Sequence, residues 1–367
     1  MTRDASFQTA DRDSFEEMVK PDRYSSRTPA FDQWISATAN HYWDPGDKAY
    51  IDFDTPFDQK NEMILPPELI PELNCAVKDR LDEGQQIAFA NESTRFMVSS
   101  LLHGEQGALS LSASLCSILV DPGTQEFATN QVREEARHVR AFTGYIQSRF
   151  GTPLAAGSTL ENILKGVVNA PEIYKKFVGM QLLVEGFAMG ACTVLYTKAN
   201  DPVLRRLAQL VMTDESFHHK FGQVWADQTV PALSPEEHAV IEGWAASTFQ
   251  MLFMNLMTAE QRRAIYPRFG LEWEWVFGAI REALTDARKR ELMKESSNMF
   301  RVVIKTLHRA GIITDRTRPM YAAWVDMSAL AKEGDEMVGD AIAADGMKFL
   351  QDINSNRAPR HLRPAKS

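Results

Sequence analysis

The sequence predicts an all-α protein built on a four-helix bundle, and two observations carry the prediction. Long stretches between residues 93 and 230 have apolar residues at the three- and four-residue spacing of helices. Two segments of this region also share an acidic pattern, in which one glutamate precedes a Glu-x-x-His motif by 30 residues. The second copy follows the first by 80 residues at both glutamates. A helix hairpin that occurs twice in register is typical of a four-helix bundle. The first copy is Glu105 with Glu135 and His138, and the second is Glu185 with Glu215 and His218.

The chemistry of this pattern points to a metal site. On a helix, Glu-x-x-His places a carboxylate and an imidazole on one face, about one turn apart. One glutamate from each of two helices and one Glu-x-x-His from each of the other two meet inside a bundle and enclose two metal ions. We therefore predict that the metal ligands are Glu105, Glu135, His138, Glu185, Glu215 and His218.

Structural salt bridges are the alternative interpretation of these residues. A single Glu-x-x-His occurs by chance on many exposed helices. Glu105 and Glu185, however, lie in apolar sequence, where a buried carboxylate is costly unless its charge is compensated. Two metal ions compensate four carboxylates at once, so we favour metal ligation. A plain helical scaffold with incidental acidic motifs is the third interpretation.

Composition excludes several functional classes. The chain has 367 residues, of which 44% are hydrophobic and 24% charged, as in a globular protein of one large domain or two modest ones. Its net charge of −9 argues against nucleic acid as the main partner, because phosphate binding needs a basic surface. Cys75, Cys116 and Cys192 form no Cys-x-x-Cys pair, so we expect no structural disulfide, zinc site or rubredoxin-type iron centre.

The sequence also predicts a cytoplasmic protein with no membrane span. Its N-terminus is polar and lacks the apolar core of a signal peptide. The stretch from residue 177 to 196 is apolar and long enough to cross a bilayer, but it contains Gln181 and Glu185 near its middle. No second stretch of comparable length exists, so we expect a buried helix of the bundle.

Residues 1–65 are polar and interrupted by turn signals, and we expect an irregular N-terminal wrap with a short helix or two. The segment Pro66–Leu73 is expected to open the first substantial helix, because prolines are tolerated in a first turn. The bundle itself is expected to span residues 66–230.

The core helices follow from their start and stop signals. Asp121-Pro122-Gly123 is expected to end the first, and Gly151 the second. Residues 151–170 form the long crossover connection between the two hairpins. Asp201 is expected to cap the fourth helix, with Pro202 at its first position. The four core helices are predicted at about residues 93–119, 125–150, 171–199 and 202–229.

Residues 231–354 are predicted to form additional helices that pack on the bundle in the same domain. Ser234 and the acids after it are a good helix start. Further helices are expected at about residues 273–287 and, basic and amphipathic, at 288–310. The tail at 355–367 is basic and contains proline, and we expect it to be disordered.

Carboxylate oxygens with one imidazole per ion suit iron or manganese better than zinc or copper. We expect two iron ions, with manganese or a mixed Mn/Fe pair left open. Glu134 and Asp214 could orient the histidine of the opposite hairpin, with Arg137 bracing such an acid, although solvated helix charges remain the alternative. His103 and His219 lie roughly 200° and 100° of helix rotation from the ligand faces and are not expected to be ligands.

The arrangement Glu…Glu-Glu-Ala-Arg-His…Glu…Asp-Glu-Ser-Phe-His resembles the ferritin-like di-iron carboxylate superfamily. That group includes ribonucleotide reductase small subunits, soluble desaturases, multicomponent monooxygenases and aminobenzoate-type N-oxygenases. The match covers about residues 93 to 228. The chain length and the additional C-terminal helices look most like the stand-alone N-oxygenases, a looser similarity.

The chain departs from several members of that superfamily. Phe142 stands where reductase subunits carry the radical tyrosine, which disfavours a tyrosyl-radical role. Met189 replaces a threonine of the multicomponent monooxygenases. Val211 replaces the additional histidine ligand of the aminobenzoate N-oxygenases, which puts arylamine oxidation in doubt. Ferritin storage chains are much shorter, so the added helices suggest a shaped pocket.

The resemblance implies an O2-activating non-haem di-iron oxygenase that inserts oxygen into a C–H or N–H bond of a small biosynthetic substrate. Hydroxylation, N-oxygenation and desaturation stay open. An external reductase or ferredoxin would supply electrons, because no flavin or iron–sulfur motif is visible, and a homodimer is expected. The alternative is a ferroxidase, or a metal-handling or radical-generating subunit, without organic oxygenation. Helix phase suggests that the substrate pocket is lined by Met97, Leu101, Leu109, Phe142, Met189, Cys192 and Phe221.

Overall fold

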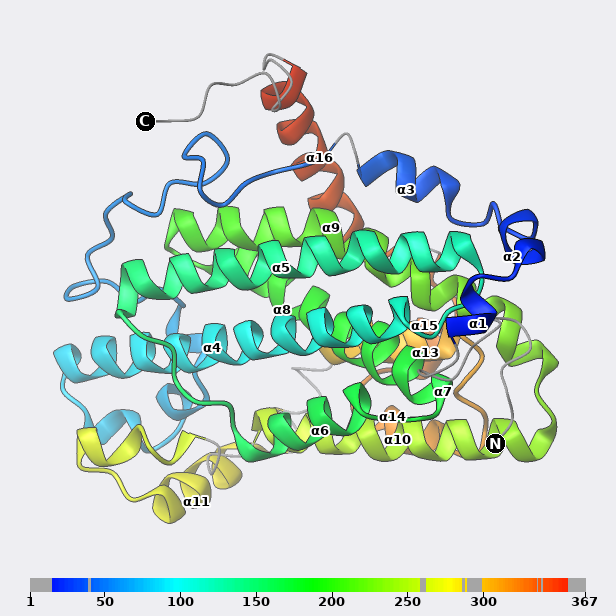
Figure 1. Cartoon of the computed structure of the whole chain (residues 1–367). Helices are drawn as coiled ribbons and strands as arrows, with labels where there is room; N and C mark the ends of the chain where they lie inside the picture. Colours follow the sequence, from blue (N-terminus) through cyan, green and yellow to red (C-terminus); the bar gives the residue numbers. More distant parts are fainter. Residues whose placement is uncertain are drawn as a thin grey trace.

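The computed structural model describes residues 15–38, 41–257, 262–285, 288, 299–334, 336–337 and 339–355. Within these ranges every regular element is helical and no β-strand occurs. The predicted fold class is confirmed: the chain is all-α, and two helix hairpins joined by a crossover form a four-helix bundle (Figure 1).

The bundle consists of two pairs of helices. α4 packs along α5, α8 packs along α9, and α5 and α9 join the pairs (Figure 1). The crossover between the pairs contains α6 (Ser158–Val168), which packs on α4. The short α7 (Ile173–Lys176) and the wide π-helical turns of η4 (Phe177–Val184) lead into α8. The four core helices are α4 (Glu83–Cys116), α5 (Pro122–Phe150), α8 (Glu185–Lys198) and α9 (Pro202–Thr229).

The first long helix begins earlier than residue 93, at Glu83, because Asp82 and Gln85 form a capping box there. The Asp82 carboxylate accepts a hydrogen bond from the Gln85 N–H at 2.8 Å, and the Gln85 side chain accepts one from the Asp82 N–H at 3.0 Å. The expectation that Pro66–Leu73 opens a long helix is wrong. This segment forms only short 3-10 turns, since Pro71 lacks an N–H and its ring blocks helix continuation. These turns are η1 (Pro67–Leu69), η2 (Pro71–Asn74) and, further on, η3 (Lys78–Arg80).

The other starts and stops follow the turn signals closely. Asp121 caps α5 by accepting from the Thr124 N–H at 2.7 Å, so the expected stop signal also starts the next helix at Pro122. Gly151 ends α5 with a φ of 79°, a conformation that glycine adopts without strain. Asp201 caps α9 by accepting from the Val203 N–H at 2.9 Å, as predicted.

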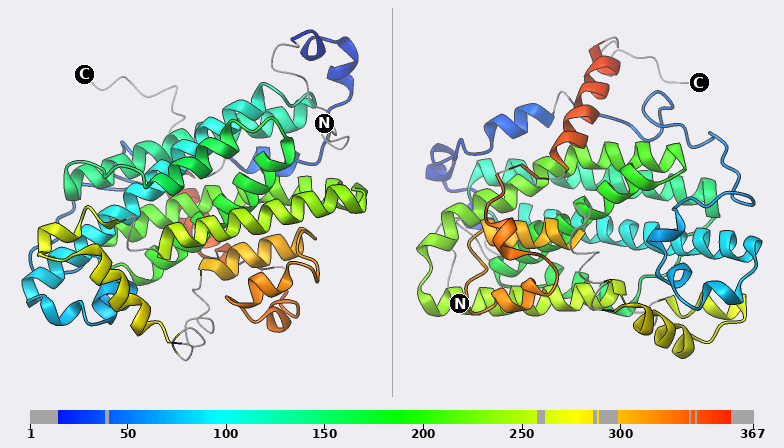
Figure 2. Two further views of the ribbon diagram at one scale, coloured as in Figure 1. Left: turned by 90° about the horizontal axis from the view of Figure 1, so that it is seen from below. Right: turned by 180° about the vertical axis from the view of Figure 1, so that it is seen from behind.

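Further helices surround the bundle. α10 runs along its lower side in Figure 1 and in the right-hand view of Figure 2, with α6 between α10 and α4. α13 packs against α8, and α16 packs against α9. The outer helices are α1 (Phe15–Met18), α2 (Pro21–Ser25), α3 (Asp32–Thr38), α10 (Pro235–Met257), α11 (Trp273–Ala283), α13 (Met299–Arg309), α14 (Arg318–Ala322), α15 (Met327–Leu330) and α16 (Asp340–Ser355), with 3-10 turns η5 (Val230–Ala232) and η7 (Tyr266–Phe269).

Two of the helices expected in the C-terminal part of the chain can be compared with the structure only in part. The helix expected at 273–287 ends at Ala283. Of the helix expected at 288–310, the structure describes Arg288 and α13, and residues 289–298 lie outside the described part. The expected basic tail lies outside it from residue 356 onward.

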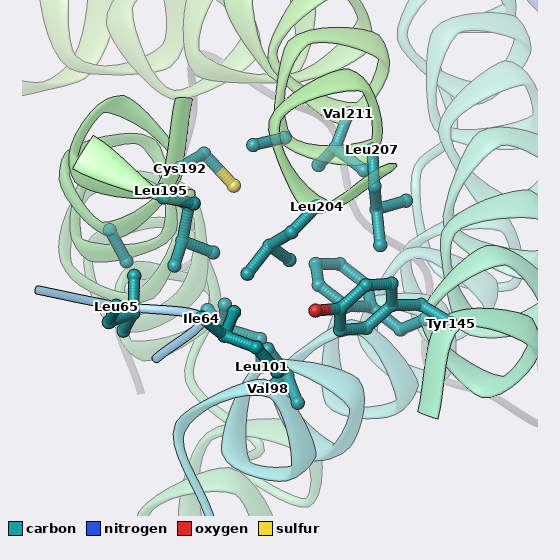
Figure 3. Close-up of a cluster of buried hydrophobic side chains, with 14 of the residues drawn as sticks. Ile64, Leu65, Val98, Leu101, Tyr145, Cys192, Leu195, Leu204, Leu207 and Val211 are labelled. Atoms are coloured by element: carbon teal, nitrogen blue, oxygen red, sulfur yellow. The ribbon is translucent and has the colours of Figure 1, made fainter. Parts of the chain in front are cut away.

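The apolar core has two parts, and each bundle helix passes from one to the other. In α4, Val98 and Leu101 belong to the first part and Leu111 to the second. In α9 the order is the same, with Leu207 in the first part and Phe221 in the second, whereas α5 runs the other way, from Phe127 in the second part to Phe142 in the first. In each bundle helix, the residues of the predicted metal site lie between the segment that packs in the first part of the core and the segment that packs in the second. Figure 3 shows the first part, where side chains from α4, α5, α8 and α9 meet Ile64 and Leu65.

One helical stretch of the described chain, Ile173–Lys198, is long and apolar enough to cross a membrane. Its most apolar window is 89% buried inside the protein, and it carries one of the predicted metal ligands. This is the pattern of a core helix.

Glu242 of α10 anchors the segment that follows α13. Its carboxylate accepts hydrogen bonds from the hydroxyls of Thr314 and Thr317 and from the Arg316 guanidinium. Burial would raise the pKa of Glu242, but these donors hold it at about 2, below its ordinary value of 4.5. A carboxyl group with a lowered folded-state pKa adds stability above pH 4.5 and loses it as the pH falls toward 2.

We therefore expect Glu242→Gln to lower the free energy of unfolding at pH 7 by about 2 kcal/mol, the size of a hydrogen bond to a charged group. The difference between wild type and variant should shrink between pH 4.5 and pH 2. Urea titrations at a series of pH values measure it. A difference that is constant over this range would show that the ionised carboxylate does not stabilise the fold.

Candidate metal centre

The structure brings all six predicted ligand residues together in the middle of the bundle. Glu105 comes from α4, Glu185 from the first turn of α8, and one Glu-x-x-His from each of α5 and α9. Their donor atoms fall into two groups, each within 4.8 Å, and all six side chains are buried. Both groups contain Glu135 and Glu215, so these two carboxylates lie between the two positions. The first group is Glu105, Glu135, His138 and Glu215, and the second is Glu135, Glu185, Glu215 and His218.

The distances between donor atoms are those of ligands around one ion. His138 Nδ1 lies 3.1 Å from Glu105 Oε2, 3.4 Å from Glu135 Oε2 and 3.0 Å from Glu215 Oε1. His218 Nδ1 lies 3.0 Å from both Glu135 Oε1 and Glu215 Oε2. Two ligand atoms each about 2.1 Å from an ion and at right angles to one another are about 3 Å apart. A single imidazole N–H could satisfy only one of these carboxylates.

The outer nitrogen of each histidine meets an acid from the opposite hairpin. His138 Nε2 lies 2.8 Å from Asp214 Oδ2, and His218 Nε2 lies 2.9 Å from Glu134 Oε2. In carboxylate–histidine–metal arrangements such an acid holds the proton on Nε2, and Nδ1 would then bind the ion. Arg137 braces Asp214 with a 2.6 Å ion pair. Sequence spacing had suggested all three of these supporting roles.

Three carboxylate oxygens at the centre accept no well-aligned hydrogen bond from the described residues: Glu105 Oε1, Glu135 Oε2 and Glu215 Oε1. His138 Nδ1 lies near the last two, but its ring already faces Glu105 Oε2. An unpaired buried polar group costs about 1–3 kcal/mol, and a charged one costs more. Cations between the helices would remove this cost. The donor set and its unpaired oxygens therefore fit a pair of metal ions.

The protonation equilibria show the same shortage of positive charge. Burial raises the pKa of Glu105 to about 8 despite the nearby His138. Burial, together with the charges of Glu215 and Glu135, raises the pKa of Glu185 well above its ordinary value. Burial alone would lower the pKa of His138, but Glu105 and Asp214 raise it well above its ordinary value. Metal binding would displace these protons.

Several residues of the site were not identified from the sequence. Gln131 and Gln181 are fully buried and bond to one another, and Gln131 Nε2 also lies 3.1 Å from Glu135 Oε1. Each stands one helical turn before a ligand glutamate, a spacing that could have revealed it. Trp43 donates its indole N–H to Asp214 Oδ2 at 2.8 Å. No sequence signal links Trp43 to this site, because it comes from the irregular segment before α4.

His41, Glu134 and Asp214 form a third buried group whose donor atoms lie within 4.8 Å. Two of the three are already engaged by the ligand histidines, and Arg137 lies beside both acids at 2.6 Å and 3.8 Å. The positive charge of the Arg137 guanidinium compensates these two acids, as a bound metal ion would. This group is therefore best described as a support for the ligand histidines.

His103 and His219 lie outside both groups of donor atoms. His103 Nε2 contacts the Leu154 carbonyl oxygen at 2.8 Å, and His219 faces Thr306 of α13. Phe142, in the position of the radical tyrosine of reductase subunits, is fully buried in the apolar core.

An apolar pocket of about 130 Å³ reaches the metal site between α4 and α8. Glu105 and Glu185 form part of its wall, beside apolar side chains such as Phe96 and Phe187. A water needs only about 10–15 Å³ by the same measure, so a small organic group fits. Of the seven residues suggested for a pocket, only Met97 and Leu101 line it. The other five do not line it, although three of them belong to α4 or α8. These five are Leu109, Phe142, Met189, Cys192 and Phe221.

The fold and the site define a helical-bundle protein with a carboxylate–histidine site for two metal ions. No protein-family model and no curated protein matches the sequence. Among solved structures, the chain is similar to a variant of an R2-like ligand-binding oxidase with an aerobically reconstituted Mn/Fe cofactor. The two share 14% identity with a TM-score of 0.40, over 89% of this chain and 93% of the other. At this level of similarity, the function of the site has to be argued from its own geometry.

The shared position of Glu135 predicts a graded loss of metal. Glu135→Ala should abolish binding of both ions, because both groups depend on this carboxylate, whereas Glu105→Ala should leave about one ion per chain. Elemental analysis after anaerobic reconstitution with Fe(II) measures this, with the exposed Glu161→Ala as control. Two bound ions in folded Glu135→Ala protein would contradict the assignment.

Asp214→Asn tests the support of the histidines. The amide keeps the shape but loses the charge that holds His138 and Arg137, so we expect metal affinity to fall about 10–100-fold. Competition with a chelator of known affinity measures the change, and circular dichroism verifies the helical fold. Unchanged affinity would mean that the helices alone orient the imidazole.

Proposed function

We propose that the protein is an O2-dependent oxidoreductase with a di-iron or mixed Mn/Fe centre, and that it oxygenates a small organic substrate at a C–H or N–H bond. One observation supports this most strongly: the wall of an apolar pocket contains one ligand from each metal position, Glu105 and Glu185. A substrate held there lies directly against both positions. A storage or purely structural metal site has no need for such a pocket.

The residues of the site would bind the metal ions, exclude water and orient the ligand histidines. Glu105, Glu135, His138 and Glu215 would hold one ion, and Glu185 with His218 and the two shared glutamates would hold the other. When bound, such a metal pair supplies the reduction of O2 that organic oxygenation requires. The apolar walls of the pocket exclude water from the substrate. Asp214 and Glu134 keep the imidazoles in one tautomer.

Electrons have to come from outside the chain, and we propose an external reductase or ferredoxin as their source. Trp43, Asp214 and His138 form a continuous hydrogen-bonded series toward the metal site. A homodimer, frequent among large helical bundles, is our proposal for the assembly.

The proposed activity is tested by anaerobic loading with Fe(II), chemical reduction and exposure to ¹⁸O2. Wild-type protein should consume O2, and Glu135→Ala should not. His103→Ala, a histidine outside the site, should behave as wild type. With a panel of small apolar acids and amines present, ¹⁸O should appear in an organic product. Label only in water, with Fe(III) accumulating whatever is added, would favour a metal-handling protein instead.

A further inference from the structure

Two pockets adjoin one another on the α4 side of the bundle. The inner one, of about 130 Å³, reaches the metal site, and the outer one measures about 340 Å³. Phe96 and Arg262 line both, so the two spaces meet at these side chains. The outer pocket lies between α4, the start of the crossover and the segment around Arg262–Arg268, which Figure 1 shows below the first half of α4.

The inner pocket is shaped by a glycine that packing does not require. Gly104 lines the pocket in the middle of the 34-residue α4, where glycine costs about 1 kcal/mol relative to alanine. A Cβ at Gly104 would meet nothing within 4 Å, whereas one at Gly107 would collide with Leu164. Gly107 therefore allows close packing, and the missing side chain of Gly104 leaves room next to Glu105.

The outer pocket has the opposite character, because it carries excess positive charge. Three arginines and one glutamate line it. Arg262 is paired with the buried Glu72 at 2.9 Å, and Arg268 is paired with Glu92 at 2.7 Å. Arg263 is exposed and makes no ion pair with any residue in the described part of the chain. One positive charge is left for a ligand.

From this polarity gradient we infer the substrate class: a small amphiphilic carboxylate that binds with its carboxylate at Arg263 in the outer pocket and its apolar end in the inner pocket, against Glu105 and Glu185. The inference rests on the proposed function, because it assumes that the substrate reacts at the metal site, next to Glu105 and Glu185. The apolar lining of the inner pocket accepts the hydrocarbon, and the acidic metal site faces its far end.

The charge of the outer pocket favours a carboxylate over a phosphate monoester. A phosphate carries about −1.5 to −2 charges at pH 7, more than a single unpaired arginine compensates. The orientation follows from the same residues. A carboxylate in the inner pocket would lie in an apolar wall beside two buried glutamates, where like charges repel.

Calorimetric titration of the full-length protein with decanoate, decyl phosphate and 1-decanol tests the ligand class. Decanoate should bind tightest, and its affinity should fall as salt is raised. Arg263→Ala should weaken decanoate about fivefold, Arg263→Glu should weaken it further, and neither should affect 1-decanol. Arg318→Ala, an exposed arginine of α14, is the matched control. Equal affinities for decanoate and 1-decanol, or tighter binding of decyl phosphate, would overturn the assignment.

Filling the inner pocket tests where the apolar end lies. Gly104→Leu should abolish binding of both decanoate and 1-decanol, while its melting temperature stays at or above that of wild type. Gly166→Leu is the matched control, since it changes a helical glycine with open space outside both pockets. Unchanged decanoate binding in Gly104→Leu would exclude the inner pocket.

The orientation is tested without turnover by loading the protein with Mn(II) under argon and measuring the NMR relaxation of decanoate. The terminal methyl should broaden more than the carbons next to the carboxylate. The reverse order would place the head at the metal site and overturn the inference. Failure to bind two Mn(II) or Fe(II) ions would count against the proposed function alone. Calorimetry with metal-free protein would still measure the binding of decanoate in the two pockets. Normal metal loading and O2 uptake without decanoate binding would overturn the substrate class alone.

Discussion

The mutual repulsion of four buried carboxylates is the constraint on which the rest of the structure depends. Two unit charges about 4 Å apart repel by about 4 kcal/mol at an effective dielectric constant of 20. Several such pairs would consume most of the roughly 5–15 kcal/mol by which a domain is stable. Glu105, Glu135, Glu185 and Glu215 nevertheless lie together in the dry centre of the bundle. Two divalent cations balance these four charges, whereas protonation would leave the oxygens poorly paired.

The surrounding structure holds this unfavourable arrangement in place. Apolar side chains fill the bundle on either side of the ligand level, so the helices cannot slide to separate the carboxylates without opening a cavity. Capping by Asp82, Asp121 and Asp201 fixes where three of the four helices begin, and with that the level of each ligand. Asp214 and Glu134 cross between hairpins to the ligand histidines, which ties the pairs of helices to one another.

The sequence was sufficient to predict that the six candidate ligands converge, because their pattern is local and repeated. Each Glu-x-x-His lies within one helical turn, and the second copy fixes the alignment of the two hairpins. The start of α4 was misjudged because Asp82 and Gln85 form a cap outside the apolar stretch. Trp43 reaches Asp214 across 171 positions of chain, which no spacing rule reveals. Five of the seven pocket candidates do not line the pocket, for another reason. Helix phase identifies the inward face of a helix, and both a filled core and an open pocket can lie on that face. Phe142 and Phe221 belong to the filled core.

Anomalous diffraction from a crystal of the Fe(II)-loaded protein tests the central claim most directly. Data collected on either side of the iron absorption edge should show two adjacent peaks per chain. One should lie nearer His138 and the other nearer His218, with Glu135 and Glu215 between them. A single peak, two peaks outside the bundle, or an empty centre in iron-replete protein would contradict the account.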